Sequence, residues 1–576
     1  MGLTEPRSRR KGTHLEAVRF DKYYRYEELT AILKAWSDER PDLCRLSSIG
    51  SSYEGRDIWL MTVSRFDTGA DTEKPAFWID ANIHAVEMTG STALLYLIDK
   101  LLRSYGTDPK VTRLLDSRAF YLTPRLNPDG TELALSEHPR YVRSSVRPYP
   151  RLDPQDGLDP EDVDGDGRVL MMRVPDPNGA WKSYTEEPRL MVPREPDEGP
   201  DDGIFYRVLP EGFIRNYDGV TIKMAPALEG LDLNRNFPME WATESEQEGA
   251  GPYPTSEPEI RAMVQAIVDR PNVCGAMHYH TFSGVYLRPY SAHEDDHFPT
   301  ADLRTYRLIG ERATSITGYP AVSVFHDFKY EPKETIKGGA DDWVYEHIGA
   351  FAWTLEFWSP QRQAGLSGYH LIDWLRDHPV EHDLKLLEWN ERELGGRGYV
   401  EWYPFDHPQL GKVELGGWDE MYCWANPPPH LLEKEIAPHA DFAIFQLAIT
   451  PKLEIRSLDV KPVGQGAYFV RLVLQNTGWL PTSVSQKAVD RKAVRPLEVE
   501  LTLPEGATLV AGEQKVEAGQ LEGRAQKRNI YWWGTNDATK DRAKMEWVIE
   551  APKGTRVSIE ARHPRAGTAR REVTLE

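Results

Sequence analysis

Hydrophobic and polar residues follow two alternating patterns along the first 360 residues of the chain. Apolar residues spaced about 3.6 apart predict helices at 23–37, 90–102, 258–269 and 303–317. Short, mostly apolar runs predict strands at 57–64, 75–81, 119–123, 273–279 and 350–358. Strands that alternate with helices indicate an α/β sheet whose two faces are covered by helices.

Two stretches depart from this pattern. Between about residues 147 and 230, Pro, Gly, Asp and Glu dominate and long apolar periodicity is lost, which predicts a long insertion on the rim of the domain. After residue 451, short segments alternate apolar and polar residues, at 452–460, 468–475, 497–503, 529–533, 544–549 and 556–561. We therefore expect a first domain over residues 15–450, closed by a helix within 427–447, and a β-sandwich over 451–576.

Composition limits the classes of partner. The formal net charge is −21 at pH 7, which argues against nucleic acid as the main partner, because phosphate binding needs a basic surface. The same charge argues against an anionic membrane surface. We expect no membrane span, because there is no apolar run of about 18 residues. The default expectation is a soluble cytoplasmic protein, because the first residues lack the apolar core of a secretory signal; a protein trimmed of its signal would look the same.

The three cysteines, Cys44, Cys274 and Cys423, lie far apart in the chain. Without a closely spaced pair they predict neither a disulfide framework nor a cysteine zinc site.

Candidate metal ligands lie where predicted strands end. His84 and Glu87 follow the strand 75–81, and an imidazole nitrogen and a carboxylate oxygen are both natural zinc ligands. Alone, this pair is more often part of a surface loop than of a metal site. His278 and His280 lie at the end of the strand 273–279, a position that faces the ligand crevice of an α/β sheet. A packed core histidine is the alternative.

Three further features bear on chemistry. Glu356 is the only charged residue of an apolar strand, and burial of an unpaired carboxylate costs several kcal/mol or raises its pKa; Glu356 is therefore either paired with an arginine or catalytic. Asn234 and Arg235 lie side by side, and arginine is the natural bidentate clamp for a carboxylate. A double glycine, Gly338 and Gly339, precedes two acids.

Taken in chain order, these motifs resemble the zinc carboxypeptidase family of the carboxypeptidase A, B and T type. The resemblance spans about residues 20–360 and implies a mixed sheet flanked by helices. It rests on His-x-x-Glu, Asn-Pro-Asp-Gly, an Asn-Arg pair, Ser-Glu-Pro-Glu, a strand that ends in His, and a Glu in a final apolar strand, found here at 84–87, 127–130, 234–235, 256–259, 280 and 356.

The resemblance implies a role for each of these residues. His84, Glu87 and His280 would bind one Zn²⁺ and leave an open position for water, and His280 is favoured over His278 because Thr, Phe and Ser follow it as in the family. Glu356 would act as general base toward that water and then protonate the leaving amine. Zinc would lower the pKa of the water toward neutrality.

Substrate binding is also implied by the resemblance. Asn234 and Arg235 would bind the C-terminal carboxylate of a peptide substrate. An arginine after the Asn-Pro-Asp-Gly turn would polarise the scissile carbonyl; Arg143 is the best match, with Arg140 and Arg147 as rivals.

The sequence departs from the family at the substrate site. Val86 stands where digestive members carry an arginine, and Glu334 stands where a mobile capping tyrosine is expected, with Tyr330 as the nearest substitute. The specificity position falls on Asp341, where an acid would favour a C-terminal Lys or Arg. Alternatively, Asp341 caps a helix that starts at Trp343.

The insertion contains acids at alternate positions, Asp162, Asp164 and Asp166, each close to a glycine. This pattern is typical of the first half of a calcium loop. The twelfth position from Asp162 is Arg173 rather than Glu, so the loop is not a complete EF-hand. A Ca²⁺ or structural cation site and a solvated acidic turn are both consistent with the sequence.

Three functions remain after these observations. The leading hypothesis is a zinc-dependent metallocarboxypeptidase that hydrolyses the C-terminal peptide bond of peptides. The second is a zinc amidohydrolase of the same fold that acts on cell-wall or other modified peptides, because loop residues set such choices. The third is a non-catalytic binding protein, disfavoured because His84, Glu87, His280 and Glu356 are all present. The sequence assigns no chemical site to the C-terminal region.

Overall fold

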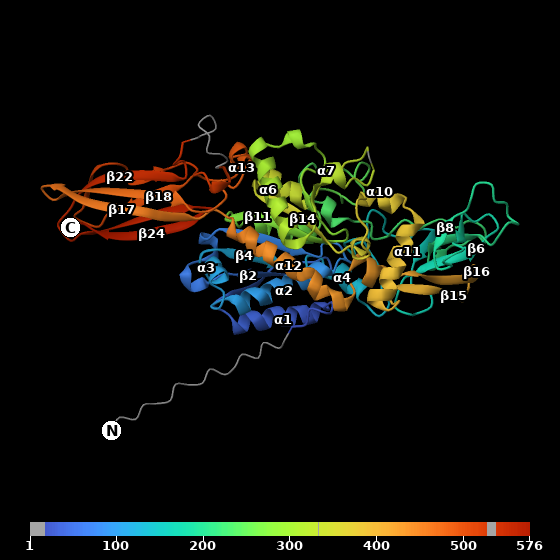
Figure 1. The fold of residues 1–576 in the computed structure, drawn as a ribbon. Coiled ribbons are helices and arrows are strands. Elements are labelled where there is room, and N and C mark those ends of the chain that lie inside the picture. The colour runs from blue at the N-terminus through green and yellow to red at the C-terminus, as the bar shows by residue number, and fades with distance from the viewer. Residues whose placement is uncertain (1–17, 332, 527–536) are drawn as a thin grey trace, which may run out of the picture.

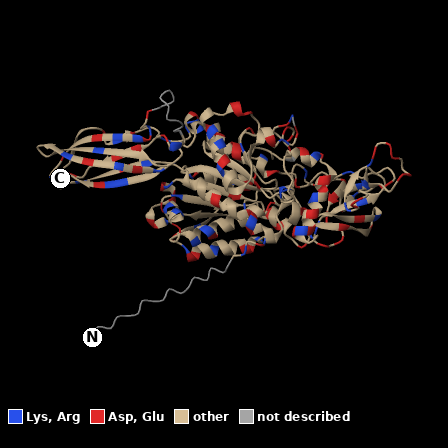
Figure 2. Ribbon diagram, in the orientation of Figure 1, with Lys and Arg blue, Asp and Glu red and all other residues tan. Residues whose placement is uncertain are grey.

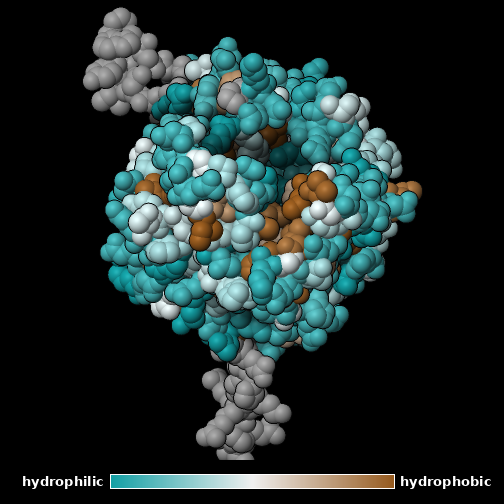
Figure 3. Space-filling view, turned by 90° about the vertical axis from the view of Figure 1, so that its right-hand side faces the viewer, coloured by the Kyte–Doolittle hydropathy of each residue, from teal (hydrophilic) through white to brown (hydrophobic). Residues whose placement is uncertain are grey.

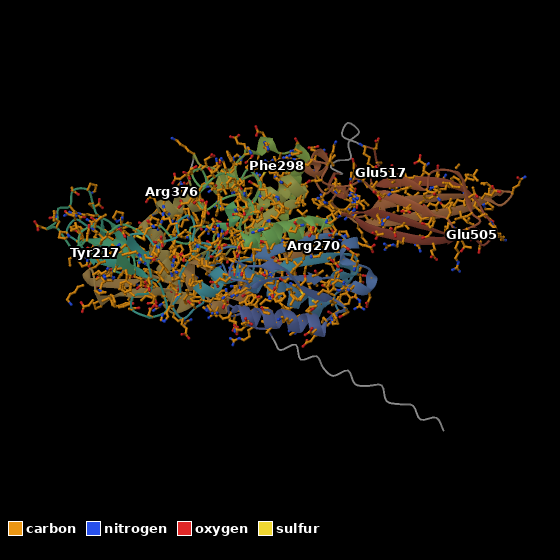
Figure 4. The ribbon with its side chains drawn as sticks, turned by 180° about the vertical axis from the view of Figure 1, so that it is seen from behind. Tyr217, Arg270, Phe298, Arg376, Glu505 and Glu517 are labelled. Carbon is orange, nitrogen blue, oxygen red and sulfur yellow. The ribbon has the colours of Figure 1, made fainter. Side chains whose placement is uncertain are left out.

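The computed structural model describes residues 18–331, 333–526 and 537–576. Three regions lie in a row (Figure 1): a central α/β region, two C-terminal sheets on one side of it, and a smaller sheet that contains the insertion on the other. Seen from behind, Tyr217 of the insertion and Glu505 of the C-terminal region mark the two opposite ends (Figure 4). No helix in the described ranges has both the length and the apolar character of a membrane span.

The central region is built on a mixed eight-stranded sheet, as predicted. Its four middle strands, β4, β3, β11 and β14, run parallel; β2 pairs antiparallel with β4 on one side, and β12 pairs antiparallel with β14 on the other. In spatial order the strands are β1 (Cys44–Ser51), β2 (Asp57–Val63), β4 (Ala119–Thr123), β3 (Ala76–Ala81), β11 (Val273–Thr281), β14 (Phe351–Phe357), β12 (Val285–Arg288) and β13 (Ala321–Ser323). The parallel strands end at one edge of the sheet, where α/β folds bind ligands.

Helices cover both faces of this sheet because its strands are apolar on both sides. In β3, Phe77 and Ile79 pack into one core, and Trp78 packs into the other. The first core is completed by α1 (Tyr26–Glu39), α2 (Thr89–Ser104), α3 (Pro109–Ser117), α6 (Thr300–Thr317) and α12 (Pro429–Ala448). The second is completed by α5 (Pro258–Val268) and α8 (Ala340–Trp343). Charged positions lie mainly on the outer helices and loops, and the central strands are largely free of them (Figure 2).

Shorter helices connect these elements. They are α4 (Pro128–Ala134), α7 (Val324–Asp327), α9 (Pro360–Gln363), α10 (Leu371–Arg376), α11 (Val380–Trp389) and α13 (Gln486–Asp490).

The insertion forms part of a second sheet. Its strands are β5 (Gly157–Pro160), β6 (Met171–Pro175), β7 (Trp181–Ser183), β8 (Met191–Pro193), β9 (Tyr206–Pro210) and β10 (Gly212–Arg215). A distant hairpin of β15 (Tyr399–His407) and β16 (Gly411–Trp418) joins β6, β9, β7 and β8 in one six-stranded sheet, and β5 pairs with β10. Figure 3 looks onto this end of the molecule, which is mostly hydrophilic and has a hollow bordered by apolar side chains.

The C-terminal region consists of two four-stranded antiparallel sheets. One is β17 (Leu453–Gly464), β18 (Ala467–Asn476), β22 (Arg542–Glu550) and β20 (Thr508–Ala511); the other is β21 (Lys515–Glu517), β19 (Glu498–Thr502), β23 (Arg556–His563) and β24 (Gly567–Thr574). Alternate side chains of both sheets, among them Leu472, Trp547 and Ile559, form one apolar core. The strand predicted at 529–533 lies outside the described residues.

The C-terminal region is anchored to the central region by hydrogen bonds to backbone carbonyls. The buried Arg565 donates to the carbonyl of Gly349 in the central region, at 3.1 Å, and to that of Ser483 within the C-terminal region, at 2.9 Å. The Ser485 hydroxyl also donates to the Gly349 carbonyl, at 2.7 Å. Gly349 directly precedes the segment that leads into β14.

Candidate active site

Three potential metal ligands meet at the carboxyl edge of the central sheet. His84 and Glu87 come from the turn between β3 and α2, and His280 comes from the end of β11. The Nδ1 atoms of the two histidines are 3.1 Å apart, and the Glu87 carboxylate lies 2.8 Å from Nδ1 of His84 and 3.0 Å from Nδ1 of His280. All three side chains are buried.

This arrangement fits a zinc ion. Two ligands of a tetrahedral Zn²⁺, each about 2.0–2.1 Å from the metal, lie roughly 3.3 Å apart, close to the separation of the two Nδ1 atoms. The close approach of two imidazole nitrogens and a carboxylate is energetically favourable when a cation lies between them. Two histidines and one glutamate are also a known ligand set of catalytic zinc.

The turn that carries these ligands is held by buried amides. Asn82 adopts a left-handed backbone φ of 61°, and its side-chain amide donates to the carbonyl of His84 at 2.7 Å. Asn127, the first residue of the Asn-Pro-Asp-Gly motif, donates to the carbonyls of Ile83 and Ser144. One amide therefore fixes the backbone next to His84 and next to Arg143.

Close packing brings α2 to the same edge. A Cβ on Gly90 would lie 2.8 Å from Cβ of Tyr279 on β11, well inside van der Waals contact. Glycine at this position lets the start of α2 approach β3 and β11, which places Glu87 beside the end of β11.

Asp232 orients the first histidine, a role that the sequence patterns did not assign to it. Its Oδ1 lies 3.0 Å from Nε2 of His84, and its Oδ2 accepts a hydrogen bond from Nε of Arg143 at 3.0 Å. Burial alone would raise the pKa of Asp232, but the charges of Arg143, Arg235 and His84 hold it well below its usual value. A carboxylate on Nε2 fixes the tautomer that presents Nδ1 to a metal. The sequence could have pointed to Asp232, because it lies only two residues before Asn234 in the same motif.

Arg143 is the arginine that lies in the site. Its guanidinium contacts Asp232 and lies 3.4 Å from Oε1 of Glu87. The two rivals are engaged elsewhere: Arg140 pairs with Glu229 at 3.2 Å, and Arg147 pairs with the buried Glu257 at 2.6 Å.

Glu356 is a buried carboxylate next to the metal ligands. It is the direct partner of His280 in the parallel β11–β14 ladder. Burial and the nearby charge of Glu87 raise the pKa of Glu356 well above its usual value. Its carboxylate accepts no hydrogen bond from the described residues and lines the same cavity as His84 and His280. Within the described part of the chain this carboxylate has no arginine clamp of its own, which favours the catalytic interpretation of Glu356.

One narrow cavity brings the predicted substrate residues together. Its volume is about 40 Å³, and its lining includes His84, His280, Arg143, Asn234, Arg235, Tyr330, Asp341 and Glu356. The backbone of α8 fixes the position of Asn234, whose side-chain oxygen accepts from the amide of Ala340 at 3.0 Å. Arg235 is buried and donates to the carbonyl of Asn234 at 2.8 Å.

Asp341 lies in the cavity and is not a helix cap. The helix α8 begins at Ala340 with Gly339 as its N-cap, so the alternative of a cap for a helix at Trp343 is wrong. Asp341 is only 4% exposed, and its Oδ2 has no hydrogen-bond partner among the described residues. The neighbouring Asp342 is turned away and accepts from the amide of Ser291.

Two candidate residues lie outside the ligand cluster. His278 is buried one pleat deeper, with Nδ1 2.8 Å from Asp80. Glu334, at the position expected for a capping tyrosine, lines a separate hollow next to the insertion. Tyr330 is the tyrosine that borders the cavity.

The acidic loop of the insertion is not part of this site. Asp162 and Asp164 lie beside Glu211, and the carboxylate oxygens of the three residues are within 4.8 Å of one another. Asp166 instead pairs with the Arg168 side chain at 2.5 Å. The sequence patterns did not point to Glu211.

Comparison with known proteins gives two family matches. A model described as zinc carboxypeptidase matches residues 29–372, and one described as a domain of unknown function matches residues 452–574.

Individual relatives match parts of the chain. Mouse carboxypeptidase A6 is 22% identical over 65% of this chain and 67% of its own length. Mouse carboxypeptidase M is 37% identical over 19% of this chain, and mouse carboxypeptidase A2 is 39% identical over 21%. These two matches span 25% and 27% of the relatives' own lengths. The crystal structure of carboxypeptidase A from Helicoverpa armigera aligns with a TM-score of 0.39 at 20% identity, covering 67% of this chain and 76% of that one.

The zinc carboxypeptidase model covers more than half of the 576 residues and includes His84, Glu87, His280 and Glu356. The chain therefore belongs to the zinc carboxypeptidase family.

Proposed function

We propose that this protein is a zinc-dependent metallocarboxypeptidase that hydrolyses the C-terminal peptide bond of peptides. The observation that carries the proposal is the convergence of His84, Glu87 and His280 on one point, beside the buried carboxylate of Glu356. Zinc, when bound, lowers the pKa of a water at its open position toward neutrality.

Glu356 acts as the proton carrier in this proposal. A carboxylate with a pKa raised by burial accepts a proton near neutral pH more readily than an exposed one. Glu356 takes a proton from the attacking water and passes it to the nitrogen of the leaving amine. Arg143 donates to the scissile carbonyl oxygen and stabilises the negative charge that develops there.

The carboxylate clamp accounts for exopeptidase action. Arg235 and Asn234 border the same cavity as Glu356, and a guanidinium beside an amide matches the two oxygens of a terminal carboxylate. A free C-terminus bound there sets the last peptide bond before Arg143 and Glu356. Positioning of this kind supplies much of an enzyme's rate enhancement.

Paired peptide substrates test this function. The zinc-loaded full chain should release the last residue of peptides with a free C-terminus and leave C-terminally amidated copies intact, because an amide removes the charge that Arg235 binds. Activity should disappear with a zinc chelator and return on addition of Zn²⁺. Equal cleavage of free and amidated peptides would contradict exopeptidase action, and activity that survives loss of zinc would contradict the metal mechanism.

We further propose that Asp341 selects peptides that end in Lys or Arg. A buried carboxylate oxygen without a partner at the substrate cavity is costly, and a cationic side chain would offset this cost. A buried charge pair worth about 2 kcal/mol corresponds to a preference of roughly thirtyfold in kcat/KM. Peptides that end in Lys, Leu or Glu measure the preference, and Asp341→Asn should remove it. A wild-type preference for Leu or Glu would overturn this assignment.

A further inference from the structure

The acidic loop of the insertion is closed at both ends around Glu211. The loop lies between β5 and β6, and Glu211 is the single residue between β9 and β10. The backbone amide of Glu161 donates to the carbonyl of Glu211 at 3.1 Å, and the amide of Glu211 donates to the carbonyl of Leu170 at 3.0 Å. Because residues 161 and 170 flank the loop, these two bonds fix Glu211 against it.

The side chain of Glu211 points into the loop and is incompletely satisfied. The residue is 1% exposed. Its Oε1 accepts from the amide of Leu170 at 2.5 Å, while Oε2 has no hydrogen-bond partner among the described residues. A buried carboxylate oxygen without a partner is costly to the folded state.

Like charges surround this carboxylate. Oxygens of Asp162 and Asp164 lie within 4.8 Å of it. Burial raises the pKa of Glu211 to about 7, with the charges of Asp164 and Asp162 adding to the increase. In the described ranges, no Lys or Arg forms an ion pair with Asp162, Asp164 or Glu211.

The loop itself turns its oxygens inward. The two carboxylate oxygens of Asp162 accept from the amides of Gly165, at 2.7 Å, and Gly167, at 2.8 Å. Both glycines have positive φ, 78° and 86°, which the tight turn requires. Oxygen donors without nitrogen or sulfur are the ligands that a hard divalent cation prefers.

We propose that Asp162, Asp164 and Glu211 bind a calcium ion. Glu211 supplies the acid that the loop lacks at its twelfth position. That position is occupied by Arg173 on β6, a cationic residue that pairs with Glu414 on β16 at 2.7 Å and cannot act as a calcium ligand. The ion neutralises the three carboxylates and ties the loop to the β9–β10 junction.

The site also reaches the distant hairpin. Tyr403 on β15 donates its hydroxyl to Oδ2 of Asp164 at 2.5 Å. A bound ion therefore links the insertion to residues 399–418, the two parts that share the six-stranded sheet.

Calorimetric titration of Ca²⁺ into the zinc-loaded full chain tests the proposal, because it needs no chelator and leaves the catalytic metal in place. We expect one Ca²⁺ per chain with a Kd of about 1 mM or lower. Glu211→Gln should weaken binding at least tenfold, because it removes one of three charges at nearly constant shape. Asp201→Asn, an exposed acid of the same insertion, is the matched control and should bind like wild type.

Two results would overturn the proposal. Absence of Ca²⁺ binding at about ten times the expected upper Kd would overturn the proposal. A loss of less than tenfold in Glu211→Gln would also overturn it. Should Glu211→Gln fail to fold, Asp162→Asn, which changes a partly exposed residue, carries the same comparison with the same threshold.

Discussion

The proposed zinc site and the acidic loop both gather potential metal ligands, but the chain brings these residues together in different ways. At the proposed zinc site, each candidate ligand lies at or just after the end of a strand in the central sheet, so strand order places His84 beside His280. In the loop, Asp162 and Asp164 are close together in the chain, and the third acid, Glu211, lies at the junction between the short strands β9 and β10. The first arrangement follows from regular secondary structure, and the second depends on irregular pairing.

The largest effect is expected at the zinc centre itself. His280→Ala should lower kcat/KM by about a thousandfold or more, because it removes a ligand of the ion on which the water activation depends. Bound zinc, measured by metal analysis, should fall with it, while the Ca²⁺ titration should stay unchanged. His278→Gln is the control and should keep its zinc, because His278 bonds to Asp80. Loss of zinc in His278→Gln alone would reverse the ligand assignment.

Glu356→Gln should cost about 10²–10⁴ in kcat, because it removes the general base while the shape of the side chain is kept. Zinc content should stay at one ion per chain. Glu259→Gln is a matched control: Glu259 is also buried, with a pKa raised to about 7 by burial, but it bonds to the amide of Tyr53 away from the cavity. Steady-state kinetics with one free-ended peptide would compare the two. Equal losses in both variants would indicate a general structural effect.

Arg143→Lys should lower kcat by about 10²-fold, because a lysine cannot reproduce the directed donors that stabilise the developing oxyanion. Arg140→Lys, which changes the partner of Glu229, should leave kcat nearly unchanged. A larger loss in Arg140→Lys would transfer the role to that rival.

The smallest effect on zinc binding is expected from Asp232→Asn, because Asp232 contacts His84 and Arg143 and is not itself one of the three proposed ligands. The amide keeps the shape but no longer fixes the histidine tautomer, and zinc affinity should fall about 10–100-fold. Competition with a chromogenic chelator measures the affinity directly. Unchanged affinity would show that the Asp232 contact with Nε2 of His84 does not orient the ligand.

The sequence predicted the central sheet and its helices, whose strands are continuous apolar runs and whose helices have clear apolar periodicity. The strand 119–123 was predicted with its observed bounds, and the helix predicted at 258–269 differs from α5 by one residue. The residues that meet at the sheet edge were predicted because a family resemblance and strand ends agreed. The family resemblance also pointed to Asn234, Arg235 and Arg143, all of which border the cavity.

The insertion shows where such prediction fails. Its strands have three to five residues, too few to establish an alternating pattern. One of them, β6, pairs with a strand of a hairpin about 240 residues further along the chain (Arg173 with Glu414), and the local sequence gives no sign of that pairing. Glu211 was missed for the same reason, because the residues next to it in the sequence do not indicate that it lies beside Asp162 and Asp164.

The buried Arg565 has a consequence for how this chain can be divided. Its guanidinium donates to the carbonyl of Gly349, just before the strand that bears Glu356, and to the carbonyl of Ser483 in the C-terminal region. Excision of the terminal sheets would remove the Arg565 and Ser485 donors from the carbonyl of Gly349. A shortened form of this chain should therefore be sought by redesign of the turn at Gly349 rather than by simple truncation.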